Sequence, residues 1–261
     1  MIPKHELSTY KQLFREVFSE SLEFCDKIFS HRLDTVFDKR ENGSIVSFLY
    51  AIPFAAKVKG RPCRAIYVYG VGTVPEARGK GYMKEVFQKM EAFYNDTVDF
   101  YYLVPASESL FSLYETLGYK TGFYLKKELL FSKRNPDLAY DIKEAPEEFH
   151  KDYLAYLEQF DTAIIRTEED NRFYLSEGNY YKIGNSGFLL LKENNTLYLR
   201  EMFLDKEAEL DCFLDFLAQK GTDSVILTRP EAKTPYAMVK PVSPFVKNAD
   251  FSIGYTNLNF D

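Results

Sequence analysis

The segment that most restricts the fold is an apolar strand that runs through a glycine-bearing loop directly into a helix. Residues 64–74 are rich in aromatic and β-branched side chains, which favour a strand. Both faces of this strand are apolar: Ile66 and Val68 lie on one, and on the other lie Cys63, Ala65, Tyr67, Tyr69 and Val71. Such a strand is typical of the centre of a sheet that is covered on both sides. The sequence therefore predicts a sheet with helices on its two faces.

The elements around this strand are predicted by their periodicity. The helix after the loop keeps the helical spacing without a break, at Met83, Val86, Phe87, Met90, Phe93 and Tyr94. Two helices are expected at the start of the chain and a strand at 45–51. After the loop helix, a strand at 100–104, a helix at 107–117 and a strand at 123–131 are expected. For the helix predicted at 107–117, Ser107 is the predicted N-cap and Gly118 is the predicted end.

The second half of the chain repeats this order of elements. A helix at 147–160, strands at 188–192 and 197–204, a helix at 206–220 capped by Asp205, and a strand at 224–228 are predicted. Matching elements lie about 125 to 130 residues apart, which indicates a duplication. A polar stretch at 132–137 separates the halves. We therefore predict two domains, residues 1–131 and 138–261, of an α/β (α+β) fold with a mixed central sheet flanked by helices.

Composition excludes several classes of function. The chain of 261 residues has a net charge of −6, whereas nucleic-acid binding needs clustered basic side chains, so no nucleic-acid partner is expected. No apolar run is long enough for a membrane span, and the N-terminus lacks a secretory signal, so a cytoplasmic location without membrane contact is expected. The three cysteines, Cys25, Cys63 and Cys212, are scattered, which favours buried, reduced thiols and no metal site.

The loop from Val71 to Met83 carries the chemistry. Its glycines allow the backbone to approach a ligand, and the N–H groups of the following first helical turn have no partner within the helix. Arg78 and Lys80 add positive charge at the positive end of the helix dipole, which suits a pyrophosphate. Neither a Walker A loop nor a dinucleotide-binding fingerprint fits, because Gly81 follows Gly79-Lys80 and Pro75 stands where the fingerprint needs glycine.

The segment resembles the signature motif of the GNAT superfamily of acyl-coenzyme A-dependent N-acyltransferases. That motif follows a strand ending near Val-Pro-Glu with Arg or Gln, two residues, Gly, one residue, and Gly or Ala. Arg78 and Gly81 match it, and Met83 stands where the small residue is usual. The segment Leu113-Tyr114-Glu115-Thr116-Leu117-Gly118-Tyr119 is similar to a second family motif. The resemblance covers residues 5 to 131 and implies a GNAT-like fold that uses acetyl-CoA as co-substrate.

The resemblance also implies roles for individual residues. The backbone of one stretch pairs with the pantetheine arm of the cofactor: Val71, Gly72, Thr73 and Val74. The N–H groups of the next stretch hold the pyrophosphate: Arg78, Gly79, Lys80, Gly81, Tyr82 and Met83. In this family a neutral amine attacks the thioester, and a general acid protonates the leaving thiolate. Tyr114 stands at the family position of that acid. The alternative for Tyr114 is packing, since it lies on one apolar stripe with Leu110, Leu113 and Leu117.

The second half resembles a degenerate GNAT-like companion domain. The turn Asp205-Lys206-Glu207-Ala208-Glu209 stands where the first half has its glycine loop, and its carboxylates would repel a phosphate. In some two-domain relatives the terminal carboxylate acts as a base, so Asp261 is a candidate base, with an ordinary chain end as the alternative. The whole chain is expected to transfer acetyl to an amine of a small molecule or peptide. Alternatives are a non-catalytic CoA-binding or protein-interaction module and an aminoacyl or long-chain acyl transferase of the tandem type.

Overall fold

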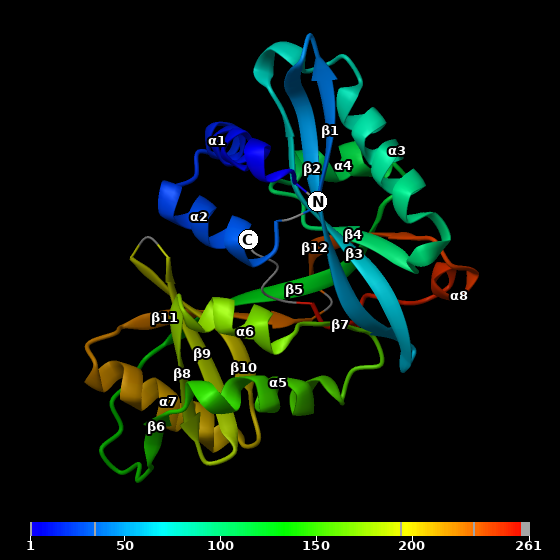
Figure 1. The fold of residues 1–261 in the computed structure, drawn as a ribbon. Helices are drawn as coiled ribbons and strands as arrows, with labels where there is room; N and C mark the ends of the chain where they lie inside the picture. Colours follow the sequence, from blue (N-terminus) through cyan, green and yellow to red (C-terminus); the bar gives the residue numbers. More distant parts are fainter. Residues whose placement is uncertain (1, 34, 194, 232, 257–261) are drawn as a thin grey trace. The chain divides into compact units, whose positions relative to one another are not determined.

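The computed structural model describes residues 2–33, 35–193, 195–231 and 233–256 (Figure 1). It divides into two compact units, and neither is a continuous piece of chain. Unit 1 consists of Met1–Thr121 and Ala237–Ala249, and unit 2 consists of Gly122–Tyr236 and Asp250–Asp261. The C-terminal residues 257–261, which include the candidate base Asp261, lie outside the described residues.

Unit 1 is a mixed sheet with the strand order β1-β2-β3-β4-β12. Its strands are β1 (Val36–Glu41), β2 (Ser44–Val58), β3 (Arg61–Thr73), β4 (Phe100–Leu103) and β12 (Thr234–Pro241). Its helices are α1 (Leu7–Phe18), α2 (Leu22–His31), α3 (Tyr82–Tyr94), α4 (Ser109–Glu115) and the short α8 (Pro244–Lys247). The β3–β4 pair is parallel, and the other neighbouring pairs with a determined register are antiparallel.

Helices cover both faces of this sheet, as the apolar faces of the central strand predict. On one face, Leu49 and Ala51 of β2 join a core cluster with Val86, Phe87 and Met90 of α3. On the other face, the Tyr50 ring packs 5.7 Å from Phe14 of α1 and 5.4 Å from Phe29 of α2, measured between ring centroids. Consecutive strand residues point to opposite faces, so β2 separates the two layers. The predicted mixed sheet flanked by helices is confirmed.

A β-bulge interrupts β3 close to its end. Tyr69 pairs with Tyr50, but the next paired positions are Gly72 and Phe48, so β3 carries an additional residue between them. Gly70 lies in the bulge with φ +55°. The bulge reverses the alternation, and Val71 therefore packs against the α3 cluster that contains Ile66 and Val68. The expectation that Val71 shares a face with Tyr67 and Tyr69 is wrong for this reason.

Unit 2 has the strand order β5-β11-β10-β9-β8-β6. Its strands are β5 (Lys120–Phe131), β6 (Ile142–Glu144), β7 (Ala163–Ile165), β8 (Gly178–Ile183), β9 (Ser186–Glu193), β10 (Thr196–Phe203) and β11 (Ser224–Pro230). Its helices are α5 (Phe149–Leu157), α6 (Glu168–Leu175) and α7 (Glu207–Gln219). The helix α7 begins after Lys206, not after Asp205, whose carboxylate accepts a hydrogen bond from Asn185 at 3.2 Å. Asp205 is therefore not the N-cap.

The two sheets share one topology. The run β8-β9-β10-β11-β5 in unit 2 corresponds to β1-β2-β3-β4-β12 in unit 1, with the same sequence of antiparallel, antiparallel, parallel and antiparallel pairs. The parallel pair again follows a crossover helix, here α7 between β10 and β11. A register irregularity also recurs between Leu199 and Glu201 of β10. This correspondence supports the duplication that the order of elements predicts.

The last strand of each sequence half lies in the sheet of the other unit. β5 pairs with β11 from Ser224↔Phe131 to Pro230↔Leu125, and β12 pairs with β4 from Met238↔Leu103 to Pro241↔Phe100. The predicted boundary at residue 131 thus differs from the structure, where β5 belongs to unit 2 from Gly122 onward. Apolar periodicity identifies strands but not their neighbours in the sheet, so the sequence could not show this exchange.

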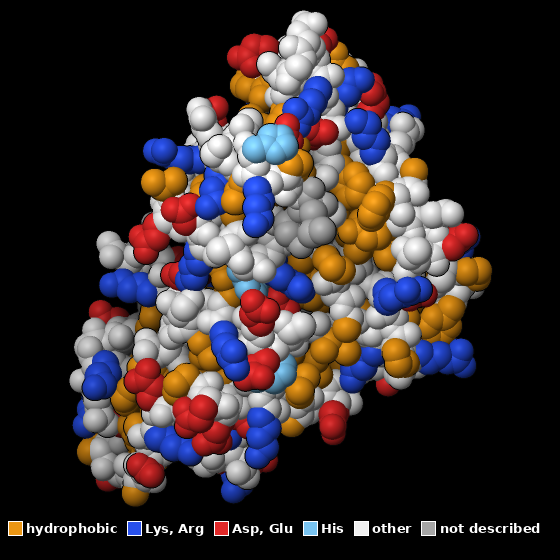
Figure 2. Space-filling model, in the orientation of Figure 1, with side chains coloured by type: hydrophobic (Ala, Val, Ile, Leu, Met, Phe, Trp, Pro, Cys, Tyr) orange, Lys and Arg blue, Asp and Glu red, His pale blue; other side chains and the backbone are white. Residues whose placement is uncertain are grey.

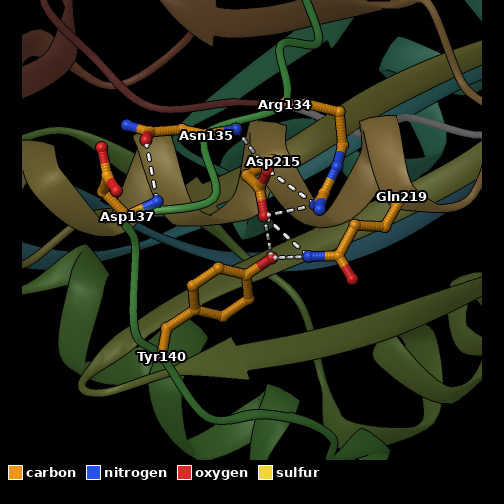
Figure 3. A network of polar contacts seen from close by, with 6 residues as sticks. All are labelled: Arg134, Asn135, Asp137, Tyr140, Asp215 and Gln219. Atoms are coloured by element: carbon orange, nitrogen blue, oxygen red, sulfur yellow. Dashed lines mark hydrogen bonds and ion pairs between the residues drawn. The ribbon is translucent and has the colours of Figure 1, made fainter.

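The polar segment after β5 is fixed to α7 by a single carboxylate (Figure 3). Asp215 accepts hydrogen bonds from the Arg134 guanidinium at 2.9 Å and the Asn135 backbone N–H at 2.7 Å. The Tyr140 hydroxyl and the Gln219 amide also donate to it, each at 2.7 Å. These bonds, first the one from Asn135 and then the one from Tyr140, lower the pKa of Asp215 to about 2. The stretch predicted to separate the halves is therefore an ordered part of unit 2.

Candidate functional site

The site begins where β3 and β4 part. The register pairs β4 with β3 at Ala65, Ile66 and Tyr67, whereas β3 runs on to Thr73. Within the part of the chain that the structure describes, β4 pairing stops at Tyr67, while β2 pairs with the opposite edge of β3 as far as Thr73. The β4 side of β3 can therefore accept an extended ligand as a strand would pair. Val71, Gly72 and Thr73 lie on this stretch, and Val74 follows it.

The connection from β3 to α3 contains two glycines in the left-handed region. A 3₁₀ turn, Pro75–Ala77, follows β3, and the Arg78 guanidinium donates to the Thr73 carbonyl at 3.2 Å. Gly79 has φ +78° and Gly81, the N-cap of α3, has φ +82°. Among the described residues, and apart from its own chain neighbours, a Cβ atom built on either glycine would meet no atom within 4 Å, so open space lies over this turn.

This turn presents the start of a thirteen-residue helix to that open space. The first N–H groups of a helix lack partners within it, and the backbone bond that closes the first turn runs from the Glu85 N–H to the Gly81 carbonyl. Tyr82 and Met83 are the first two residues of α3. Open space, unpaired donors and the helix dipole together fit a bound pyrophosphate. The residues present therefore fit a coenzyme A phosphate group.

Charged side chains around the turn come from β1 as well as from the loop. The ammonium group of Lys80 lies 3.3 Å from the carboxylate of Glu41, and the Tyr82 hydroxyl donates to the same carboxylate at 2.7 Å. These two bonds, the one from Tyr82 first, lower the pKa of Glu41, which is therefore a carboxylate at neutral pH. The sequence did not single out Glu41, because its strand is remote from the loop along the chain.

Tyr114 is buried on α4, with 6% of its surface exposed. Its ring lies 6.1 Å from Phe87 and 6.2 Å from Tyr119 between centroids, in the cluster that Val71 and Met83 also contact. Burial raises the pKa of Tyr114 to about 12, so the hydroxyl keeps its proton at neutral pH. The structure thus brings Tyr114 to the core beside the loop, where it also packs as the apolar stripe predicts.

The helix that carries Tyr114 is shorter than the sequence predicts. It spans Ser109–Glu115 with Glu108 as N-cap, whereas the Ser107 hydroxyl pairs with that of Ser109 at 2.9 Å. Ser107 is therefore not the N-cap. Gly118 ends the turn with φ +88°, and the N–H of Tyr119 bonds the Tyr114 carbonyl at 3.1 Å. The predicted glycine stop is confirmed.

Sequence reasoning missed two other residues that shape the loop. The buried Ser47 hydroxyl donates to the Gly72 carbonyl at 3.1 Å and lies 2.9 Å from the Thr73 hydroxyl, so it fixes the end of β3. Gly70 forms the bulge. A glycine inside a strand pattern is a known sign of a bulge, so the signal for Gly70 was present. Ser47 has no such signal, because its contact depends on the strand register.

Two other kinds of functional feature, a metal cluster and a membrane-spanning helix, are absent from the described part of the chain. Among the residues the structure describes, no group of three or more His, Cys, Asp or Glu side chains could hold a metal ion. Within the same residues, no helix is long and apolar enough to cross a membrane. On the face that Figure 2 shows, basic and acidic side chains are interspersed over the coloured residues rather than gathered into a basic stripe. Cys25, Cys63 and Cys212 are free and buried.

Residues 2–122 match the family model described as acetyltransferase (GNAT) domain. This part of the chain is a GNAT domain. By sequence, no curated protein matches the chain. The matched region contains β1 to β4, the loop and α4, together with both motifs that the sequence resemblance rests on.

Solved structures resemble the chain beyond this GNAT domain. A conserved protein of Enterococcus faecalis V583 superposes with a TM-score of 0.78 at 18% identity, over 92% of this chain and 71% of that chain. A GCN5-related N-acetyltransferase of Anabaena variabilis ATCC 29413 has a TM-score of 0.75 at 14% identity, with the same coverage. Eis1 of Mycobacterium abscessus has a TM-score of 0.65 at 10% identity, over 93% and 73%. At these identities the likeness shows the fold.

The counterpart of the GNAT loop in unit 2 has a different construction. β10 ends at Phe203 and α7 begins at Glu207, so the connection is Leu-Asp-Lys, without glycine. The hydroxyl of Ser186 accepts from the Asp205 N–H at 2.8 Å and donates to Glu209 in the first turn of α7. Carboxylates and a serine therefore occupy the N-terminus that binds phosphate in a GNAT loop.

A buried ion pair fills the region after the β10 irregularity. Glu201 takes the place in the register that Gly72 takes after the bulge of unit 1. Its carboxylate lies 2.6 Å from the Arg166 guanidinium and accepts a hydrogen bond from Tyr255, and the Arg166 and Glu201 side chains are 3% and 2% exposed. The guanidinium also stacks 4.2 Å from the centroid of Tyr153. Unit 2 thus closes this region with its own side chains.

Proposed function

We propose that the protein is an N-acetyltransferase that moves an acetyl group from acetyl-CoA to an amine of a small molecule or peptide. The observation that carries the proposal is the continuous run of β3, its bulge, the open double-glycine turn and α3. This run offers a strand edge for an extended pantetheine arm and helix N–H groups for a pyrophosphate, in one chain segment. The match of residues 2–122 to the GNAT family supports it.

Each part of the site has an assigned role in this proposal. The backbone from Val71 to Val74 pairs with the pantetheine arm, and the N–H groups from Gly79 to Met83 bind the pyrophosphate. The Arg78 N–H, which the sequence resemblance also assigns to the pyrophosphate, is bonded to the Pro75 carbonyl at 3.3 Å. Acetyl-CoA supplies the activated acyl group when bound. The hydroxyl of Tyr114, which keeps its proton at neutral pH, donates that proton to the leaving sulfur. The buried Ser47 holds the end of β3 at the position that this pairing requires.

Unit 2 is proposed to be a companion without a cofactor site. Its β10–α7 connection lacks glycine, and its helix N-terminus is occupied by Glu209 and Ser186. We therefore expect one CoA per chain. Unit 2 contributes to acceptor selection in this proposal, since a GNAT fold varies its acceptor side while it keeps its cofactor loop.

The burial of Tyr114 favours a second candidate function, a module that binds coenzyme A without turnover. A Tyr whose ring lies wholly within an apolar cluster would contribute packing and no proton. In that case acetyl-CoA binds, but no amine is acetylated and no thioester is hydrolysed.

Calorimetry and an activity screen on the full chain test these proposals together. Acetyl-CoA is titrated first, and free thiol release is then followed with panels of aminoglycosides, polyamines, amino acids and peptides. Binding at one CoA per chain with amine-dependent thiol release supports the transferase. Binding without release for every class of amine supports the module. No binding contradicts both, and two CoA per chain contradicts the companion role of unit 2.

A further inference from the structure

One carboxylate connects β1 to the cofactor loop. Glu41 is the last residue of β1, and it contacts both Lys80 in the loop and Tyr82 at the start of α3. The Tyr82 ring has the ammonium groups of Lys80 and Lys39 within 5.7 and 5.2 Å of its centroid. Lys39 in turn lies 2.7 Å from Glu85 of α3. Both of these lysines therefore have a carboxylate partner within the protein.

We infer that Glu41 competes with the cofactor phosphate for Lys80 and thereby sets the affinity of the loop for coenzyme A. This inference rests on the proposed function. Glu41 pairs with Lys80 at 3.3 Å, and its bond from Tyr82 places it at the same N-terminus of α3 that the pyrophosphate would occupy. Its two contacts imitate those of a phosphate, since one oxygen accepts from a hydroxyl and the other pairs with an ammonium group.

The exposure of Lys80 and Glu41 to solvent allows a phosphate to replace Glu41 as the partner of Lys80. The side chains of Lys80 and Glu41 are 47% and 40% exposed, so their ion pair is weak and opens readily to a ligand. A bound phosphate would replace Glu41 as the partner of Lys80, but the carboxylate stays attached to β1 beside it. The Glu41–Lys80 ion pair must therefore open before Lys80 can bind the phosphate, and for an exposed pair this corresponds to a loss of affinity of up to about fivefold. Glu41 thus lowers the affinity of the loop for the cofactor.

Replacement of Glu41 by glutamine isolates its charge. Glu41→Gln retains an oxygen that accepts the Tyr82 hydroxyl and has the same size, so the fold of the loop is kept. We expect calorimetry with CoA to show binding up to about fivefold tighter than in the wild type, because Lys80 no longer has to leave an ion pair. Because the effect is electrostatic, the gain in affinity should disappear in about 1 M salt, where charges are screened within about 3 Å.

Two further variants separate competition from a general charge effect. Glu85→Gln makes the same charge change in the first turn of α3, but Glu85 pairs with Lys39 and not with Lys80. It should tighten CoA binding less than Glu41→Gln does. In a Lys80→Gln background, Glu41→Gln should lose most of its gain, because the contested cation is gone.

Different results would contradict the competition by Glu41 and the proposed function on which it rests. A wild-type protein that does not bind CoA contradicts the proposed function. A wild type that binds CoA, with Glu41→Gln equal or weaker, overturns the competition alone. An equal gain from Glu85→Gln, or a gain that survives the loss of Lys80 or high salt, also overturns it.

Discussion

Gly72 lies so close to Phe48 that a Cβ atom on Gly72 would stand 2.7 Å from the Phe48 ring. The same atom would come within 3.0 Å of Val17 on α1. The Gly72 backbone has ordinary extended geometry, so the requirement for glycine here comes from space and not from φ. The aromatic layer under α1 is thus packed against the backbone of the strand that we assign to the pantetheine arm.

Gly72→Ala is therefore expected to destabilise unit 1 through overpacking, by about 1–3 kcal/mol. Urea unfolding of the variant measures this loss. Phe48→Leu removes the atoms that the new methyl group meets, at its own cost in packing. The loss of unfolding free energy in the double variant should be smaller than the sum of the two single losses, because the smaller side chain at position 48 relieves the clash. Strict additivity would show that the loss caused by Gly72→Ala does not come from the Phe48 ring.

Gly81→Asp should abolish tight acetyl-CoA binding. The aspartate adds a negative charge and side-chain bulk at the helix N-terminus proposed for the pyrophosphate, so the affinity should fall at least about tenfold. Gly60→Asp is a matched control, because Gly60 has φ +71°, equally open space, and a place at the other end of β3. It shares the backbone strain but should bind acetyl-CoA as the wild type does. Equal affinity for all three proteins would remove the loop from the site.

Tyr114→Phe should lower kcat by at least about tenfold with little change in CoA affinity, if the hydroxyl donates the proton. The pKa of about 12 keeps this acid protonated, so Tyr114 should cause no loss of activity as pH rises from 7 to 10. Tyr119→Phe is the control: it removes a neighbouring buried hydroxyl that has no hydrogen-bond partner among the described residues. That variant should keep its kcat. A Tyr114→Phe protein with normal kcat and a lowered Tm would reassign Tyr114 to packing.

The sequence predicted the local structure from β3 through the double-glycine turn into α3 well, because its determinants are local. The glycines, the apolar strand and the helical period of Met83 to Tyr94 all act over adjacent residues, and the structure has each of them. The helix caps were predicted less well. Ser107 and Asp205 are good capping residues by type, but Ser107 bonds Ser109 and Asp205 bonds Asn185. In each case the side chain bonds a nearby polar side chain instead of capping the helix.

The features that the sequence could not show depend on register and on contacts between distant segments. Val71 changes face because a bulge at Gly70 inserts one residue, and alternation alone cannot locate such an insertion. Glu41 meets Lys80 only because β1 ends beside the start of α3. The exchange of β5 and β12 also follows from which edges remain open in each sheet, a property of the assembled fold.

Asp215→Asn should destabilise unit 2 in a manner that depends on pH. The folded carboxylate has a pKa of about 2, below the value of about 3.9 for an unfolded aspartate, so its stabilising effect is complete above pH 4 and is lost as pH falls toward 2. The difference in unfolding free energy between wild type and variant should therefore be largest near pH 7 and should narrow between pH 4 and 3. Asp211→Asn, an exposed change on the same helix, is the control and should show no such trend. A gap that is constant with pH would mean that the Asp215 charge is not responsible.

Residues 1–131 expressed alone should fail to form a cooperative domain. The fragment contains the whole GNAT match, but it lacks β12, whose Ala237, Met238 and Val239 are buried in unit 1. Met238 belongs to the same core cluster as Tyr114 and Phe87, so its loss opens that core, and β4 is left with an unpaired edge that favours aggregation. The fragment would also expose β5, which normally pairs with β11. Coexpression with residues 132–261 should restore a soluble complex with a single thermal transition, because each piece supplies the strand that the other lacks. A sharp, reversible melting transition of 1–131 alone would show that the exchanged strand is dispensable.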